Sequence, residues 1–306
     1  MNPIWLIVAL VLALFLLMSG IAWYVSHSLL HPPKRSLHET ERLELERTPE
    51  IYQSFLTWEN IHYIVETKDQ ISLACYFIPT NRPKGKRKLA IIAHGYSYTH
   101  HGSIKYAHML RELGYDCILF DERNHGNSTG KKTTMGYLES FDLETIYLDA
   151  LNRFGHYSQI GLVGESMGGA SVLLAISRLK QVDFAIVDCP YMSLKDIVKH
   201  QLRRRHLPRV GIVPLVQWFF WMATGVTYRK ISLLDAVKQT NQPLLFVHGK
   251  ADGYIPPIHS EMLAKYHIGK HRLYLADQDS HHAGSYRKNP EEYQNQVNLF
   301  LQENQL

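Results

Sequence analysis

One short segment of the sequence places a nucleophile between two glycines. Ser166 lies between Gly164 and Gly168 in a Gly-x-Ser-x-Gly pattern that follows an apolar run beginning at Ile160. A strand that turns sharply into a helix leaves no room for Cβ atoms beside the turn residue, which favours glycine there. The pattern therefore predicts that Ser166 stands exposed on a strained turn. The alternative interpretation is a glycine-rich turn whose serine only caps a helix.

Catalysis by this serine requires a base and a third group that orients the base, because a serine hydroxyl is a weak nucleophile near neutral pH. Asp252 and His282 each come shortly after an apolar run of strand type, later in the chain than Ser166. Either one alone is also explained as a surface loop residue. Their joint occurrence in the order Ser, Asp, His favours a catalytic triad. We predict that Ser166 attacks, His282 moves the proton and Asp252 orients the imidazole.

Two backbone N–H groups are candidates for stabilising an oxyanion. The N–H of Met167 begins the helix after the turn, where amides point at a developing negative charge. The second donor should come from the loop after an earlier strand, which starts with His94, Gly95 and Tyr96. We predict that the N–H of Tyr96 is this donor. His94 itself is expected to shape the turn.

Strands and helices that alternate along the chain must position these residues. A predicted hairpin at residues 61–66 and 71–78 is followed by continuous apolar runs, such as residues 89–93, that are typical of strands buried on both faces of a parallel sheet. We therefore predict an α/β fold with a mostly parallel sheet flanked by helices. Residues 191–236 interrupt the alternation, and a connection of this length is usually functional or a small subdomain. We predict a helical cap there.

The apolar run at residues 210–226 within this cap contains Trp218 and Phe219 and carries no charge between residues 212 and 222. We expect it to select an apolar acyl group and to approach the membrane. The alternative is that these aromatic side chains only pack the cap onto the sheet.

The N-terminus is apolar over a length that can cross a membrane. Residues 4–25 contain no charge, and aromatic residues lie near both ends of this run. A cleaved signal peptide is disfavoured, because no Lys or Arg precedes the run and no small-x-small cleavage site follows it. We predict a transmembrane anchor at residues 1–26, a polar linker at 27–55 that holds one short helix, and a hydrolase domain at 56–306.

These boundaries predict a single-pass protein of the cell membrane. The first positive side chains, Lys34 and Arg35, follow the anchor, which slightly favours a cytoplasmic domain. Every predicted site residue lies beyond residue 30, so we expect an enzyme without residues 1–30 to be soluble and active. The sequence does not determine the oligomeric state.

Composition limits the remaining classes of function. The net charge of +5 includes basic clusters at residues 84–88 and 203–205, but no aromatic residues are interleaved with them, so nucleic-acid binding has little support. The three cysteines lie in or beside apolar runs and form no disulfide framework. The eighteen histidines include His94, His100, His101 and His108, but no acidic partner recurs at ligand spacing. We predict neither a metal nor a cofactor.

Five motifs in order carry a resemblance to a known family. They are His94-Gly95-Tyr96, the loop from Asp121 to Ser128, Gly164 to Gly168, His248 to Asp252, and His282 to Tyr286. From about residue 61 onward the chain resembles α/β-hydrolases of the serine aminopeptidase and lysophospholipase-like branch, close to membrane-anchored hydrolases of Gram-positive bacteria. The resemblance favours His282 over His281 as the base. It also implies that the loop from Asp121 is structural and that His125 is not catalytic.

Together, the residues and the resemblance predict a serine hydrolase that cleaves a carboxylic ester or a related acyl bond of a small-molecule substrate through an acyl-enzyme. A peptidase and a thioesterase are the alternatives within the fold. A catalytically silent binding or scaffold protein is the alternative from another class.

Overall fold

Eight strands form one sheet in the computed structural model, which describes residues 2–80, 87–179 and 181–306. Their order across the sheet is β1-β2-β4-β3-β5-β6-β7-β8. The strands are β1 (Ile61–Glu66), β2 (Ser72–Ile78), β3 (Lys88–Ala93), β4 (Tyr115–Phe120), β5 (Gln159–Glu165), β6 (Phe184–Asp188), β7 (Leu244–Gly249) and β8 (His271–Ala276). The first two pairs are antiparallel and all later pairs are parallel, which confirms the predicted mostly parallel sheet.

Helices cover both faces of this sheet, and neighbouring residues of a central strand therefore enter different cores. In β3, Ile91 packs in the core that includes α5 (Tyr137–Phe154) and α6 (Met167–Ala175). The next residue, Ile92, packs in the core that includes α4 (Ile104–Glu112) and α12 (Pro290–Glu303). Burial on both faces explains why these strands are apolar throughout rather than alternating.

The remaining shorter elements connect or flank these layers. They are η1 (His100–Ser103), η2 (Ile176–Arg178), η3 (Tyr228–Ile231), α9 (Leu233–Val237), α10 (Ile258–Tyr266) and α11 (Ser285–Lys288). The carboxyl ends of β3, β5 and β6 lie in register, since Ala93 is opposite Gly164 and Gly164 is opposite Val187. The loops that leave these strands therefore start side by side, at the edge where open α/β sheets bind ligands.

The N-terminal segment is more structured than its sequence suggests. Helix α1 (Pro3–Leu30) continues past the predicted anchor boundary at residue 26. The predicted linker holds two helices, α2 (Leu37–Arg47) and α3 (Pro49–Phe55), where the sequence indicated one short helix. Helix α2 begins with a capping box, in which the side chains of Ser36 and Glu39 satisfy each other's backbone N–H groups.

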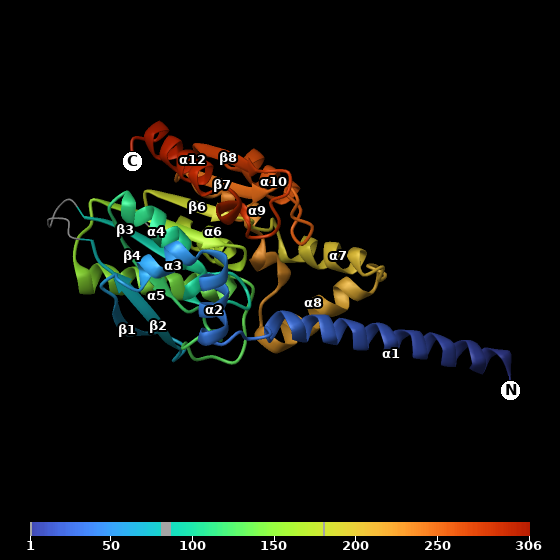
Figure 1. Cartoon of the computed structure of the whole chain (residues 1–306). Coiled ribbons are helices and arrows are strands. Elements are labelled where there is room, and N and C mark those ends of the chain that lie inside the picture. Colours follow the sequence, from blue (N-terminus) through green and yellow to red (C-terminus); the bar gives the residue numbers. More distant parts are fainter. Residues whose placement is uncertain (1, 81–86, 180) are drawn as a thin grey trace.

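Helix α1 has two halves with different surroundings, and Figure 1 shows it projecting from the rest of the molecule. The large apolar side chains from Ile4 to Leu17 are exposed, whereas Ala22, Ser26 and Leu30 are buried. We call Met18–Leu30 the docked half. Its end is tied to the domain by the Thr133 N–H, which donates to the Leu30 carbonyl at 2.9 Å. Residues 18–30 are thus part of the folded domain, which removes the basis for treating residues 1–30 as dispensable.

Residues 191–236 form helices over one end of the sheet, as the sequence predicts. They include α7 (Leu194–Arg204) and α8 (Ile212–Thr224), and α8 packs along α1. The apolar run of α8 divides into two faces. Ile212, Val216 and Phe220 are buried, while Trp218, Trp221 and Met222 are exposed.

Candidate active site

Ser166 occupies the turn between β5 and α6, with φ 54° and ψ −110°. Residues other than glycine rarely adopt such angles, and neighbouring packing must hold them in place. A Cβ on Gly164 would lie 2.4 Å from the Gly168 carbonyl oxygen, and one on Gly168 would lie 2.2 Å from the Ala93 carbonyl oxygen. Backbone contacts therefore require both glycines of the pattern.

The structure brings the three predicted triad residues into a line. His282 Nδ1 lies 2.7 Å from Asp252 Oδ2, and His282 Nε2 lies 3.1 Å from Ser166 Oγ. An ionised carboxylate only accepts hydrogen bonds, so Nδ1 carries the proton and donates it. With the proton on Nδ1, Nε2 is free to accept from the Ser166 hydroxyl. This is the geometry that general-base activation of a serine needs.

Asp252 is held by more groups than His282 alone. Its Oδ1 accepts from the backbone N–H groups of Tyr254 and Ile255 at 2.9 and 2.8 Å, and His248 Nε2 lies 3.3 Å from Oδ2. Burial by itself raises the pKa of Asp252, but the hydrogen bonds with His248 and His282 outweigh burial and hold the pKa below its ordinary range. The carboxyl therefore stays ionised. Sequence reasoning gave His248 no role of its own, although it stands in the motif of Asp252.

The two predicted oxyanion donors belong to loops that meet beside Ser166. Met167 is the first residue of α6, and the first amides of a helix have no acceptor within the helix. On the other side, a Cβ on Gly95 would lie 3.7 Å from Ser166 Cβ, so the loop that carries Tyr96 passes close to the nucleophile. The Tyr96 hydroxyl points away, toward α1, where it donates to the Ser28 carbonyl.

The other histidines near the site have different contacts. His281 is exposed, and its Nδ1 lies 3.1 Å from the Ala251 carbonyl, not near Ser166. His94 is buried and its Nε2 accepts from the Glu122 backbone N–H at 2.9 Å, so it links two loops. The His125 ring packs edge-on against His94. These contacts agree with the structural roles predicted for His94 and His125.

A buried ion pair lies next to the nucleophile, and the sequence analysis missed it. Lys105 Nζ contacts Glu165 Oε2, which also accepts from the Tyr106 hydroxyl at 2.8 Å. The same hydroxyl lies 3.0 Å from Asp188 Oδ2. Burial and the nearby charge of Glu165 raise the pKa of Asp188 to about 6. These residues come from α4, β5 and β6, so no local spacing along the chain connects them.

Cys189 is a further potential nucleophile within reach of the triad. Its Sγ lies 4.0 Å from His282 Nε2, and with Asp252 the three residues form a group close enough to hold a metal ion. Burial raises the pKa of the Cys189 thiol well above its ordinary value, so the thiol stays neutral. A neutral thiol is neither a good metal ligand nor a good nucleophile, so this cluster gives no reason to invoke a cation or thiolate chemistry.

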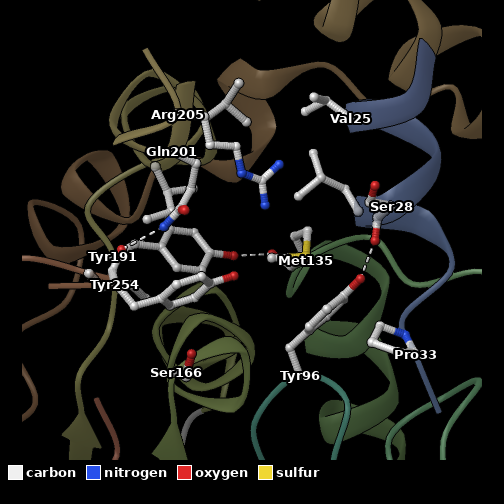
Figure 2. Close-up of a pocket in the computed structure, with 14 residues that line it drawn as sticks. Val25, Ser28, Pro33, Tyr96, Met135, Ser166, Tyr191, Gln201, Arg205 and Tyr254 are labelled. Carbon is white, nitrogen blue, oxygen red and sulfur yellow. Dashed lines mark hydrogen bonds between the residues drawn. The ribbon is translucent and has the colours of Figure 1, made fainter. Parts of the chain in front are cut away.

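Two cavities adjoin Ser166, and both are bordered by Ser166, Tyr96 and Tyr254. The first, of about 210 Å³, we call the apolar cavity; it is shown in Figure 2. Its other lining residues are Val25, Ser28, Leu29, Pro33, Met135, Tyr191, Ile197, Val198, Gln201, Arg205 and Ile255. Its walls thus come from α1 and α7 as well as from the loops at the carboxyl ends of the strands. Trp218 and Phe219 are not among its lining residues, which corrects the expectation that they line an acyl site.

The second cavity, of about 320 Å³, we call the arginine cavity. Its other lining residues are Arg35, Arg47, Gly95, Tyr98, Glu165, His282, Ala283 and Arg287. Arg287 pairs with the buried carboxylate of Glu44, whereas Arg35 lies over the ring of Tyr98. Within the described ranges, no carboxylate forms a salt bridge with Arg35 or Arg47. The cavity is therefore rich in positive charge.

A mostly parallel sheet with a serine on a strand-to-helix turn is the architecture of an α/β-hydrolase. The protein family described as serine aminopeptidase, S33 matches residues 84–229. The uncharacterized protein YqkD of Bacillus subtilis is 30% identical over 279 residues, which cover 90% of each chain. The chain therefore belongs to the α/β-hydrolase superfamily, in the serine aminopeptidase S33 family, and the Bacillus relative agrees with the resemblance to Gram-positive proteins.

Two further comparisons are of lower identity. The Pyrococcus furiosus esterase Pf2001 has a TM-score of 0.66 at 23% identity and matches 82% of this chain and 93% of its own, which shows a shared fold. A protein of Saccharomyces cerevisiae, the uncharacterized membrane protein YNL320W, is 23% identical over 154 residues. That match covers 50% of this chain and 49% of the yeast protein.

Proposed function

We propose that this protein is a serine hydrolase that cleaves a carboxylic ester through an acyl-enzyme. The observation that carries the proposal is the line of contacts from Asp252 Oδ2 through His282 to Ser166 Oγ, at 2.7 and 3.1 Å. A serine on a strained turn, a neutral imidazole and an ionised carboxylate are the parts that acyl transfer requires. A binding or scaffold protein would have no need to keep this alignment.

The reaction would run in two halves. Ser166 Oγ attacks the carbonyl carbon while its proton passes to His282 Nε2, and Asp252 stabilises the resulting imidazolium. The Met167 and Tyr96 N–H groups would hold the negative oxygen of the tetrahedral intermediate. The imidazolium then returns the proton to the leaving alcohol, and the acyl group stays on Ser166. In the second half, water attacks the acyl carbon while its proton passes to His282 Nε2. The imidazolium then returns the proton to Ser166 Oγ, and the acid is released.

An ester fits the cavities better than an aminoacyl substrate does. An aminopeptidase must bind a free α-amino group, which carries a positive charge. Among the described residues that line the two cavities, the one carboxylate is that of Glu165, and it is already bound to Lys105 and Tyr106. The arginines nearby would repel the ammonium group. We therefore favour esterase activity over aminopeptidase activity.

The protein would act at a membrane. One helix among the described residues, Pro3–Leu30, is long and apolar enough to span a bilayer, and its most apolar part is fully exposed. An exposed surface of this kind is unfavourable in water. We propose that α1 is an uncleaved anchor that crosses the cell membrane once. Lys34 and Arg35 after the helix favour a cytoplasmic catalytic domain.

The decisive experiment is labelling with a fluorophosphonate, which reacts with an activated serine. We expect the parent protein to be labelled on Ser166 and to hydrolyse nitrophenyl esters, and the Ser166→Ala variant to lose both properties while keeping its circular dichroism spectrum. Ser171, which is buried in the following helix, provides the matched control through Ser171→Ala. Equal labelling of the parent and Ser166→Ala would contradict the proposal.

A further inference from the structure

Helix α1 is longer than a membrane needs, and its excess length lies inside the domain. Its 28 residues extend about 42 Å, whereas a hydrocarbon core of about 30 Å needs about 20 residues. A span that starts near Pro3 therefore ends near Trp23 and Tyr24, two exposed aromatic residues of the type found at membrane interfaces. The docked half begins at Met18, several residues earlier. Part of the folded domain therefore lies at the depth of the bilayer.

Helix α8 is the part of the domain that reaches this depth. A Cβ on Gly211, the residue before α8, would lie 2.2 Å from Met18 Cε. Farther along the helix, Phe219 and Met222 share a hollow with Trp23 of α1. The sequence of α8 contains no charged residue, and its outer face is apolar and aromatic. A helix with this surface is suited to the boundary between headgroups and acyl chains.

A groove connects this depth with the nucleophile. It runs between α1 and the segment after α7, and its walls include Leu16, Gly20 and Leu207. The groove and the apolar cavity share Val25 and Arg205 as lining residues, so the two spaces adjoin at these side chains. Figure 2 shows both side chains beside the cavity. The rise along α1 from Leu16 to Val25 is about 14 Å. A path lined mostly by apolar side chains, with Arg205 where the groove adjoins the cavity, thus leads from bilayer depth to Ser166.

We propose that the acyl chain of the substrate enters the apolar cavity sideways from the bilayer, through the groove between α1 and residues 205–207. The substrate is then an ester of a long-chain acid that resides in the membrane. Helix α1 acts both as the anchor and as one wall of the substrate site. This inference rests on the proposed hydrolase function and on α1 as a membrane span.

The test uses the full chain reconstituted in vesicles of ether-linked phosphatidylcholine, which offers no ester bond of its own. The quantity measured is the rate on nitrophenyl palmitate dissolved in the bilayer divided by the rate on nitrophenyl acetate in water. Gly20→Phe places a ring in the groove, and a Cβ at Gly20 meets no atom within 4 Å, so the fold should tolerate it. We expect this ratio to fall at least about tenfold.

Two further variants keep the test decisive. Ala13→Phe adds a ring at an exposed position of α1 that precedes the groove, and it should leave the ratio at the parent value. Leu207→Trp narrows the groove from its other wall and should lower the ratio even if Gly20→Phe fails to insert. Equal ratios in the parent, both blocked variants and the control would overturn sideways entry and leave the hydrolase intact. A parent that is neither labelled on Ser166 nor active on nitrophenyl acetate would contradict the hydrolase itself, and the entry route with it.

Discussion

The apolar cavity and the arginine cavity meet at one serine but offer opposite chemistry. The apolar cavity is lined by aliphatic and aromatic side chains with Arg205 at its edge, while three arginines line the other. An acyl chain gains about 0.8 kcal/mol per CH₂ that leaves water for an apolar site. A guanidinium instead binds a phosphate or a carboxylate through charge-assisted hydrogen bonds. We therefore expect the acyl part and the leaving group of an ester to occupy different cavities.

This contrast has a structural origin in the N-terminal segment. Val25, Ser28 and Leu29 of α1 border the apolar cavity, and Arg35 and Arg47, which follow α1, border the arginine cavity. The segment that precedes the sheet thus contributes to both sides. An anchor and a linker with no contacts to the domain would leave both cavities more open.

The largest expected effect tests whether the two cavities serve a single catalytic centre. His282→Ala removes the base that both sides share, so kcat should fall by about 10³-fold or more for every ester, whatever its acyl chain or leaving group. His281→Ala should change kcat by less than about threefold, because His281 faces the Ala251 carbonyl. Steady-state kinetics on a series of nitrophenyl esters measures both variants. The reverse ranking would transfer the role of base to His281.

A smaller effect is expected when the N-terminus is truncated, because this change removes residues from one cavity only. Deletion of residues 1–30 removes Val25, Ser28 and Leu29 from the apolar cavity but no residue from the arginine cavity. In detergent, we expect kcat/KM for nitrophenyl octanoate, relative to the acetate, to fall about tenfold or more, with a lower Tm. Deletion of residues 1–17 keeps the docked half and serves as the control. If both truncations retain the parent's preference for octanoate, α1 does not form a wall of the acyl site.

The smallest effect concerns the charge of the arginine cavity. Arg47→Gln should lower kcat/KM for an acyl glycerol phosphate by about three- to tenfold, because Arg47 is exposed and its interactions are screened by water. The same variant should leave the corresponding uncharged acylglycerol unaffected. Arg42→Gln is the matched control, since Arg42 is also exposed on α2 but lies outside the cavity. If kcat/KM falls equally for the charged and the uncharged substrate, the arginine cavity does not bind an anionic group of the substrate.

The sequence predicted the sheet and the positions of the triad because both depend on local patterns. Continuous apolar runs such as that of β3 identify strands that are buried on both faces. The glycines around Ser166 are recognisable because any Cβ at those positions collides with backbone. Asp252 and His282 were found because each follows a strand, and parallel strands bring such loops to one edge of the sheet.

By itself, the sequence therefore determined the fold class, and it predicted a candidate nucleophile and the chain order of its candidate partners. Only the tertiary structure decided where the exposed part of α1 ends and where the helix begins to line the apolar cavity. Residues 4–17 are entirely apolar, whereas residues 18–30 also contain serine, glycine and histidine. This difference in composition does not say which surface the second segment packs against, because that depends on the position of α8 and of the loop that carries Thr133. The ion pair of Lys105 and Glu165 and the two cavities likewise arise from residues far apart in the chain. Their contacts exist only after the sheet has brought the loops together.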